Sequence, residues 1–123
     1  MNVDDLKVYQ DSMQIAERIW KEIMGWNYFA KDTVGKQLVR CADSIAANIS
    51  EGFGRYHFAE NRKFCYYSRG SLNETLTFIH KAKDRNLIEE SVAYDLSQQL
   101  ITLRKRLNAY IRSIGPTTGN SPS

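Results

Sequence analysis

Apolar residues recur along the chain with the three-to-four-residue spacing of amphipathic helices, and they divide residues 1–115 into four segments. The spacing predicts helices over residues of about 4–24, 32–54, 58–85 and 89–114. The two prolines, Pro116 and Pro122, both follow the last segment, so no proline interrupts a predicted helix. The sequence contains none of the short alternating runs between turn residues that are typical of strands. The chain is therefore predicted to be all-α.

Residues that favour helix ends mark the boundaries of these segments. Aspartate suits the position before a helix, so Asp4 or Asp5 is predicted to cap the first helix and Asp32 the second, after a loop over residues 25–31. Glycine and asparagine readily adopt the left-handed conformation that closes a helix. The predicted closing residues are Gly25, Gly52, Gly54 and Asn86.

The first and third helices each carry two neighbouring apolar stripes. In the first helix the leading stripe is Tyr9, Met13, Ala16, Trp20 and Ile23, and the second is Val8, Ile15 and Ile19. In the third helix the leading stripe is Phe64, Ser68, Ser71, Thr75, Phe78 and Ala82, and the second is Cys65, Leu72, Leu76 and Ile79. These arcs are wider than one core face requires, so we expect the protein to cover part of them by self-association. The alternative is that long loops and aromatic residues cover them.

The last helix has a single apolar seam, formed by Val92, Leu96, Leu100, Leu103, Leu107, Tyr110 and Ile114. Four helices of about 20 to 28 residues with short connections favour an up-down-up-down four-helix bundle. A length of 123 residues fits one domain, here residues 1–115. Residues 116–123 are polar and are expected to form a disordered tail.

The chain shows no sign of export or membrane insertion. Its first residues include an acidic pair and lack the apolar region of a signal peptide, and no stretch is long and apolar enough to span a membrane. We therefore expect a soluble, cytoplasmic protein. Cys41 and Cys65 lack the close spacing of a metal site and are interpreted as buried small side chains.

Positive charge gathers in the second half of the chain, although the net charge is only +3. Clustered cations can bind a phosphate backbone without reading its sequence, and Arg62, Arg69 and Tyr66 are expected on one solvent face that suits single strands. The alternative is an ordinary solvated helix face. The candidate nucleic-acid-binding residues are Arg62, Lys63, Arg69, Arg104, Lys105, Arg106 and Arg112.

Catalysis requires a convergent set of acid, base, nucleophile or metal ligands, and the sequence offers none. His57 and His80 have no partner at the spacing of a two-ligand metal site, and the Glu-x-x-His pairs of di-iron bundles are missing. We expect no catalytic residues, no metal and no cofactor, and hence no enzyme.

Two motifs resemble those of a known family. They are Ser44-Ile45-Ala46-Ala47-Asn48-Ile49-Ser50-Glu51-Gly52-Phe53-Gly54-Arg55 and, downstream, Gly70-Ser71-Leu72-Asn73-Glu74. Together with the opening Asp5-Leu6-Lys7-Val8-Tyr9-Gln10, they are similar to the 23S rRNA intervening-sequence proteins, also called the S23 or four-helix-bundle protein family. The resemblance runs from about residue 5 to residue 114.

This resemblance implies an up-down bundle that assembles as a homopentamer. It also implies similarity to the accessory variability proteins of diversity-generating retroelements, which bind nucleic acid and a reverse transcriptase. The motif residues Asn48, Glu51, Gly52, Gly54, Arg55, Gly70, Ser71 and Glu74 are interpreted as structural. We hypothesise that Asn48, Ser71 and Glu74 form a polar network, and that Gly70 permits close approach of the second helix.

These observations predict a non-catalytic, homo-oligomeric scaffold, pentameric if it follows the family, with weak RNA or DNA binding through basic helix faces. The alternative is a protein-interaction module, for example one that acts on a reverse transcriptase without touching nucleic acid.

Overall fold

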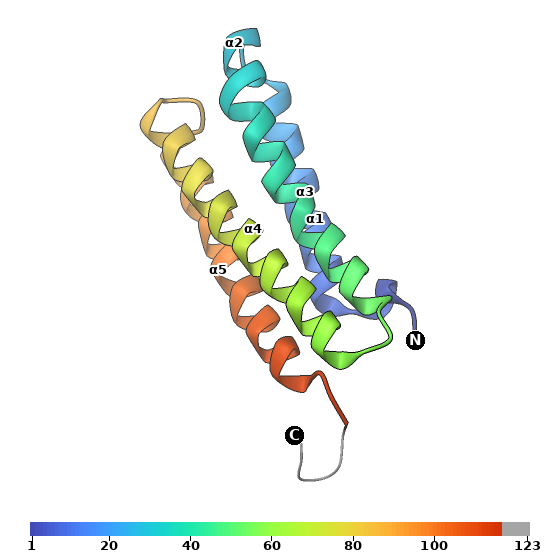
Figure 1. The fold of residues 1–123 in the computed structure, drawn as a ribbon. Helices are drawn as coiled ribbons and strands as arrows, with labels where there is room; N and C mark the ends of the chain where they lie inside the picture. The colour runs from blue at the N-terminus through green and yellow to red at the C-terminus, as the bar shows by residue number, and fades with distance from the viewer. Residues whose placement is uncertain (117–123) are drawn as a thin grey trace.

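The computed structural model describes residues 1–116, and within this range the chain forms four long helices and no strand (Figure 1). The long helices are α1 (Lys7–Met24), α3 (Lys36–Phe53), α4 (Phe58–Asp84) and α5 (Glu90–Ser113). Three short segments complete the fold: η1 (Val3–Asp5), α2 (Tyr28–Ala30) and η2 (Lys31–Gly35). The predicted disordered tail, residues 116–123, lies outside the described residues except for Pro116.

Consecutive long helices run in opposite directions, as the short connections predicted (Figure 1). Around the bundle the order is α1, α3, α4, α5, and α1 and α5 close the ring; α3 and α4 make the most extensive contact. One end of the bundle holds the N-terminus, the α3–α4 turn and the end of α5 (Figure 1). The predicted up-down-up-down bundle is therefore confirmed.

The core is a continuous apolar cluster to which all four long helices contribute. Leu96, Leu100, Leu103 and Leu107 of α5 are at most 1% exposed, as the single seam predicted. Removing one such leucine side chain from water contributes on the order of 1.5–3 kcal/mol to folding. The α5 seam therefore anchors the bundle along its whole length.

In α1 the core is formed mainly by the stripe that the sequence placed second, together with Ile23 from the leading stripe. Val8, Ile15 and Ile19 are buried, whereas Met13 and Trp20 of the predicted leading stripe are 50% and 48% exposed. Packing here buries the β-branched side chains, Ile23 among them, and leaves the larger side chains of Met13 and Trp20 half exposed. The stripe left outside gives this chain an apolar outer strip on α1.

The core face of α4 combines residues from both predicted stripes. Leu72 and Ile79 alternate there with the small side chains of Ser68 and Thr75. The Ser68 hydroxyl donates to the Ile45 carbonyl oxygen at 2.7 Å, which satisfies a buried polar group across the α3–α4 contact. Small side chains on this face explain why α3 and α4 can pack so closely.

The connection between α1 and α3 is mostly helical, so the loop predicted over residues 25–31 is too long. Asn27, and not Asp32, provides the cap: its side-chain oxygen accepts from the Ala30 N–H at 3.0 Å. The chain then runs through the π-helical turn η2 into α3 without a break. Buried Trp26 packs beneath this turn, close to Gly35. This packing explains why helix begins several residues before Asp32.

Of the other predicted helix ends, the cap at Asp4 or Asp5 is wrong, whereas three of the four predicted closing residues are confirmed in position. Asp4 and Asp5 lie in the separate turn η1, and α1 begins after Leu6. Gly25 and Gly54 close α1 and α3 as predicted, but with φ of −85° and −80°, in the right-handed region and not the left-handed one. Gly52 does not close α3, because it lies within the helix. Asn86 closes α4 with φ of +61°, as predicted.

Candidate nucleic-acid interface

The seven predicted cationic residues lie on two neighbouring stretches of helix. They lie in the first half of α4 (58–70) and the last half of α5 (104–113), and these two stretches are adjacent because the helices are antiparallel. The stretches contain seven Lys/Arg and one acidic residue, Glu60, for a net charge of +6. Since the whole chain carries +3, the remainder carries −3. The bundle is therefore electrically polarised although its net charge is small.

Three of the arginines line the contact between α4 and α5, which we call the arginine seam: Arg62, Arg69 and Arg104. Each guanidinium donates one hydrogen bond across the seam to a neutral oxygen. The bonds are Arg62 Nη1 to the Ile114 carbonyl at 2.9 Å, Arg69 Nη1 to Asn108 Oδ1 at 2.8 Å and Arg104 Nη1 to Asn73 Oδ1 at 2.7 Å.

The neutral acceptors have an electrostatic consequence. A carboxylate partner would cancel the charge of each arginine, whereas a carbonyl or amide oxygen leaves it in place. Each bond uses one of the five N–H groups of a guanidinium, so the remaining donors are not committed to these bonds. The arginine seam is thus a row of cations held in position but not neutralised.

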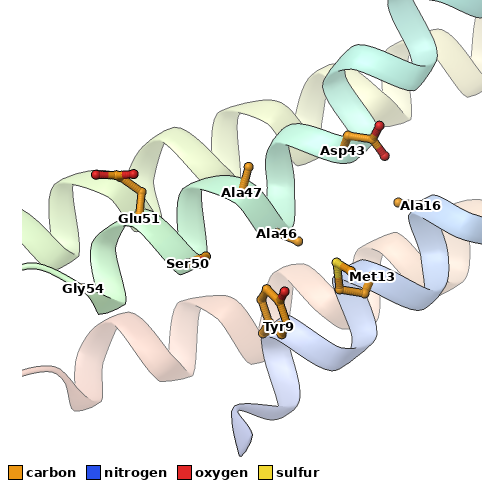
Figure 2. Close-up of a pocket in the computed structure, with 9 residues that line it drawn as sticks. All are labelled: Tyr9, Met13, Ala16, Asp43, Ala46, Ala47, Ser50, Glu51 and Gly54. Carbon is orange, nitrogen blue, oxygen red and sulfur yellow. The ribbon is translucent and has the colours of Figure 1, made fainter. Parts of the chain in front are cut away.

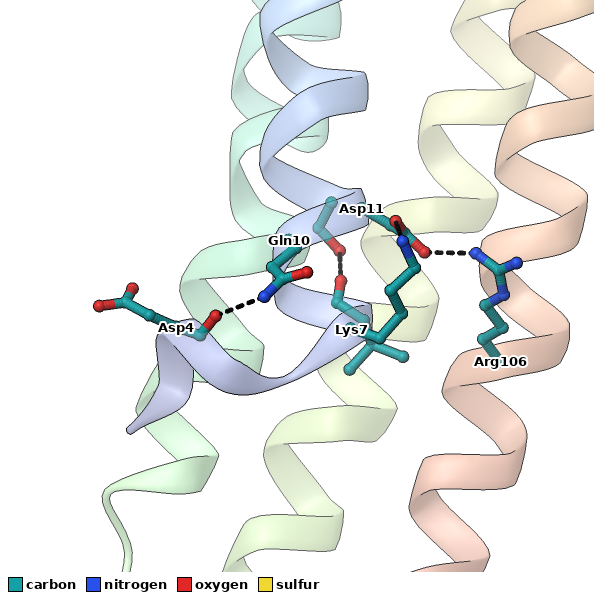
Figure 3. Close-up of polar contacts among 7 residues, drawn as sticks. Asp4, Lys7, Gln10, Asp11 and Arg106 are labelled. Atoms are coloured by element: carbon teal, nitrogen blue, oxygen red, sulfur yellow. Dashed lines mark hydrogen bonds and ion pairs between the residues drawn. The ribbon is translucent and has the colours of Figure 1, made fainter. Parts of the chain in front are cut away.

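Arg106 is placed differently from the seam arginines. It reaches towards α1, where its Nη1 lies 2.6 Å from the Asp11 carboxylate, and Lys7 lies 3.2 Å from the same group (Figure 3). Asp11 offsets part of the Arg106 charge, although Lys7 shares the same carboxylate, so Arg106 is a weaker candidate for phosphate contact than the seam arginines. Lys63, Lys105 and Arg112 are exposed and form no ion pair within residues 1–116.

Aromatic rings lie next to the arginine seam. Tyr66 and Tyr67 are 47% and 51% exposed on the outer side of α4. The Arg69 guanidinium carbon lies 5.1 Å from the centre of the Tyr66 ring, a cation–π contact. Tyr67 packs edge-on against Phe64 with ring centres 5.5 Å apart. Both rings are therefore held in place while part of each faces solvent.

Sequence reasoning missed the residues that hold the seam arginines, namely Asn73, Asn108 and the Ile114 carbonyl. No local signal marks these residues, because an asparagine on a helix face is ordinary. Their pairing follows from the antiparallel register of α4 against α5, which brings Arg69 opposite Asn108 and Asn73 opposite Arg104. A prediction of how α4 aligns with α5 could have identified these residues.

The predicted polar network of Asn48, Ser71 and Glu74 does not form within the described residues. Asn48 donates to the Ser44 carbonyl of its own helix at 2.9 Å, and Glu74 is exposed. Glu51 and Arg55, also motif residues, form an ion pair at 2.7 Å one turn apart. The motif side chains therefore bond mainly within α3.

The expected close approach at Gly70 is also wrong. A Cβ atom built on exposed Gly70 would meet nothing within 4 Å, whereas one on buried Gly52 would lie 2.8–2.9 Å from atoms of Asn61 and Phe64. The close contact between α3 and α4 is thus made at Gly52. Gly70 faces open space on the outer side of α4.

A second surface feature lies between α1 and α3, on another side of the bundle. It is a groove of about 590 Å³ (Figure 2). Its lining residues are Tyr9, Met13, Ala16, Asp43, Ala46, Ala47, Ser50, Glu51 and Gly54. Partial burial raises the pKa of the Asp43 carboxyl above its usual value, and the nearby Glu17 charge adds to this. The groove is lined largely by small side chains and carries two carboxylates, Asp43 and Glu51.

Neither metal binding nor membrane insertion finds support in residues 1–116. No group of three or more His, Cys, Asp or Glu side chains in this range is placed to hold a metal ion. His57 and His80 are both exposed, on the α3–α4 turn and on α4. In the same range, no helix combines the length and apolar character that crossing a bilayer requires.

Comparison with known proteins identifies the family. The family model of the 23S rRNA-intervening sequence proteins matches residues 4–109. The fold is similar to a crystal structure from Bacteroides thetaiotaomicron, described as a protein of unknown function from the S23 ribosomal protein family. The TM-score is 0.77 at 22% identity, over 86% of this chain and 99% of that one. A comparison with curated proteins gives no significant match. On the family model, the chain belongs to the 23S rRNA-intervening sequence protein family.

Proposed function

We propose that this protein is a non-catalytic helical scaffold that assembles from copies of itself and binds the phosphate backbone of RNA or DNA through the arginine seam. The observation that carries the proposal is the neutral partner of each seam arginine. Arg62, Arg69 and Arg104 keep their charge while hydrogen bonds fix their positions. A fixed row of cations attracts a polyanion without needing to read its sequence.

Lys63, Lys105 and Arg112 extend this surface. Their exposed ammonium and guanidinium groups add sequence-independent attraction on either side of the seam. Residues 58–70 and 104–113 carry a net charge of +6 and one acidic residue, Glu60; exposed Glu74, next to Asn73, is a second carboxylate at the edge of the seam. Binding of this kind weakens steeply as salt rises, because it releases counterions from the nucleic acid.

The proposed assembly rests on the outer strip of α1. Met13, Trp20 and Met24 are each about half exposed along one side of this helix. Large contiguous apolar patches on a protein surface mark interaction sites, and these three side chains follow one another along the same helix. A second copy is the partner always available, and five copies is the state that the family resemblance favours.

The alternative is a protein-interaction module, such as an accessory protein of a reverse transcriptase. The α1–α3 groove favours it, because small residues such as Ala46 and Ala47 leave room for a side chain or helix from a partner. In that case the same apolar surface would serve a different protein, and nucleic acid would not bind.

Fluorescence anisotropy with a labelled RNA homopolymer tests the nucleic-acid part. We expect log affinity to fall linearly with log salt between about 50 and 200 mM. Replacing Arg62, Arg69 and Arg104 by glutamine removes three charges but keeps N–H donors, and should reduce the slope by about two. The control Lys21→Gln/Lys36→Gln/Arg40→Gln removes the same charge from α1 and α3 and should change affinity little. Absence of binding at low salt, or equal losses in both variants, contradicts the proposal.

Light scattering tests the assembly. We expect the native chain to form an oligomer and the variant Trp20→Glu/Met24→Glu to be a folded monomer, because charges cannot be buried in an apolar contact. The variant Gln98→Glu/Thr102→Glu carries the same added charge on α5 and should still assemble. A native chain that is monomeric at micromolar concentration would refute the assembly. Assembly without RNA binding would favour the alternative.

A further inference from the structure

We propose that the arginine seam is a single-strand-binding site, in which phosphates follow the seam and a base stacks on Tyr66 above the bare backbone at Gly70. This inference rests on the proposed function and specifies its ligand. Its evidence is the combination of an unexplained glycine, two fixed rings and the row of cations described above.

Gly70 is the starting observation because the fold gives no reason for it. It is residue 13 of the 27-residue helix α4, where glycine costs about 1 kcal/mol relative to alanine. Nothing within 4 Å would obstruct a side chain there, so packing inside the described chain does not require glycine. Glycine also serves where a ligand must approach the backbone closely. Gly70 leaves such an opening on the outer side of α4.

Tyr66 lies one helical turn before Gly70 and provides a stacking surface. Its ring is about half exposed and is held by the Arg69 guanidinium at 5.1 Å. Tyr67, also half exposed, is fixed against Phe64. Two immobilised rings beside a position without a side chain leave room for a planar base to lie against them.

The seam places phosphate-binding groups beside these rings. Arg62, Arg69 and Asn73, which holds Arg104, follow one another along α4 at intervals of seven and four residues. At 1.5 Å per residue the row extends over about 16 Å, which is enough for a few nucleotides. Arg69 contacts both the seam and the Tyr66 ring, so the phosphate row and the stacking surface meet at this residue.

The combination discriminates between strands and duplexes. In a duplex the base faces are already stacked on each other, so a duplex can use only the cations. A single strand can use both the cations and the rings. Stacking on an aromatic side chain does not require a 2′-hydroxyl, so single-stranded RNA and DNA should both bind, each more tightly than a duplex by about tenfold or more.

The test compares labelled single-stranded RNA, single-stranded DNA and a duplex of the same length on the full chain. We expect Tyr66→Leu to weaken single-strand binding about tenfold, to leave the salt slope unchanged and to leave duplex binding unchanged. Gly70→Leu should weaken single-strand binding similarly while the protein melts at an equal or higher temperature. Thr77→Leu, an exposed position farther along α4, is the matched control and should bind normally.

Each outcome separates this inference from the proposed function. Equal affinity for strand and duplex, with a normal salt slope, overturns the single-strand site and leaves phosphate binding intact. If the native chain binds neither single strands nor duplexes, both the single-strand site and the proposed phosphate binding are overturned. If Gly70→Leu alters the oligomer seen by light scattering but not single-strand affinity, the opening at Gly70 is a protein contact and the inference is wrong.

Discussion

Gly52 and Gly70 both lie inside long helices and both belong to the family motifs, yet the structure uses them in opposite ways. Gly52 is buried where α3 meets α4, with atoms of Asn61 and Phe64 at 2.8–2.9 Å from the place of its missing side chain. Gly70 faces outward with nothing within 4 Å. The same residue type serves internal packing near the end of α3 and leaves an exposed surface in the middle of α4.

This difference teaches where the two motifs act. The first motif holds the bundle together, because a side chain at Gly52 would push α3 and α4 apart. The glycine of the second motif has no such internal role, so its explanation lies outside the chain. The arginine seam and the rings of Tyr66 and Tyr67 lie on the same half of α4, which is why we assign that region to a ligand.

The largest effect is expected at Gly52. Gly52→Ala should destabilise the protein by about 2 kcal/mol, because the new methyl group must displace the backbone of α4 and this outweighs the better helix propensity of alanine. Chemical denaturation monitored by circular dichroism measures the free energy of unfolding. Unchanged or increased stability would show that α3 and α4 are not closely packed at this position.

Cys65 offers a second measurement of the same contact. Burial raises the pKa of its thiol to about 11, and the reactive thiolate is scarce in the folded protein at pH 8. A thiol reagent should therefore label Cys65 only when the bundle opens. In Gly52→Ala, labelling should be about 30 times faster, which corresponds to 2 kcal/mol. A Cys41→Ala background isolates the signal, and rapid labelling of the native form would contradict the buried position.

Gly70→Ala should have an effect of opposite sign and about half the size. Alanine gains up to about 1 kcal/mol of helix stability, and its methyl group enters open space. The same denaturation experiment measures the gain, with Gly52→Ala as the matched substitution. A loss of stability at Gly70 would remove the contrast between the two glycines and the argument that Gly70 faces a ligand.

The smallest effect is expected on the other side of α3, at the open α1–α3 groove. The raised pKa of Asp43 means that folding disfavours its carboxylate, so this group costs stability at neutral pH and recovers it as the pH falls through its pKa. Asp43→Asn should gain less than about 0.5 kcal/mol at pH 7, since the side chain is largely solvated. The gain should vanish in acid.

A double-mutant cycle with Glu17→Gln identifies the cause of the Asp43 effect. Because the Glu17 charge contributes to the shift, the two substitutions should be less than additive. Full additivity would leave burial as the sole cause. A gain at Asp43 as large as the loss at Gly52 would show that the Asp43 carboxylate is far less solvated than its exposed position indicates.

The sequence predicted the helices better than it predicted which side of each helix is buried. The number of long helices, their order and the Asn86 closure followed from periodicity and local propensity. The buried stripe of α1 did not, because Tyr9, Met13 and Trp20 repeat as regularly as Val8, Ile15 and Ile19. Periodicity reports that a stripe is apolar, but only the neighbouring helices decide which of two stripes is covered.

For the candidate site, too, the sequence predicted some properties and not others. The sequence identified all seven cations of the +6 region, since charge can be counted along a chain. It could not show that Arg106 turns towards Asp11 while Arg62, Arg69 and Arg104 meet neutral oxygens. Such pairing depends on which helices are adjacent and in what register, and residues up to 52 positions apart in the seam carry no mark of it.

The sequence by itself determined an all-α chain of four long helices, a leucine seam on α5 and a concentration of positive charge in the last two helices. These properties are local, because each depends on residues within a few turns of one helix. Only the tertiary structure decided that Gly52 packs, that Gly70 is open and that three arginines keep their charge. Those properties depend on distances between helices, and packing of the whole core sets such distances.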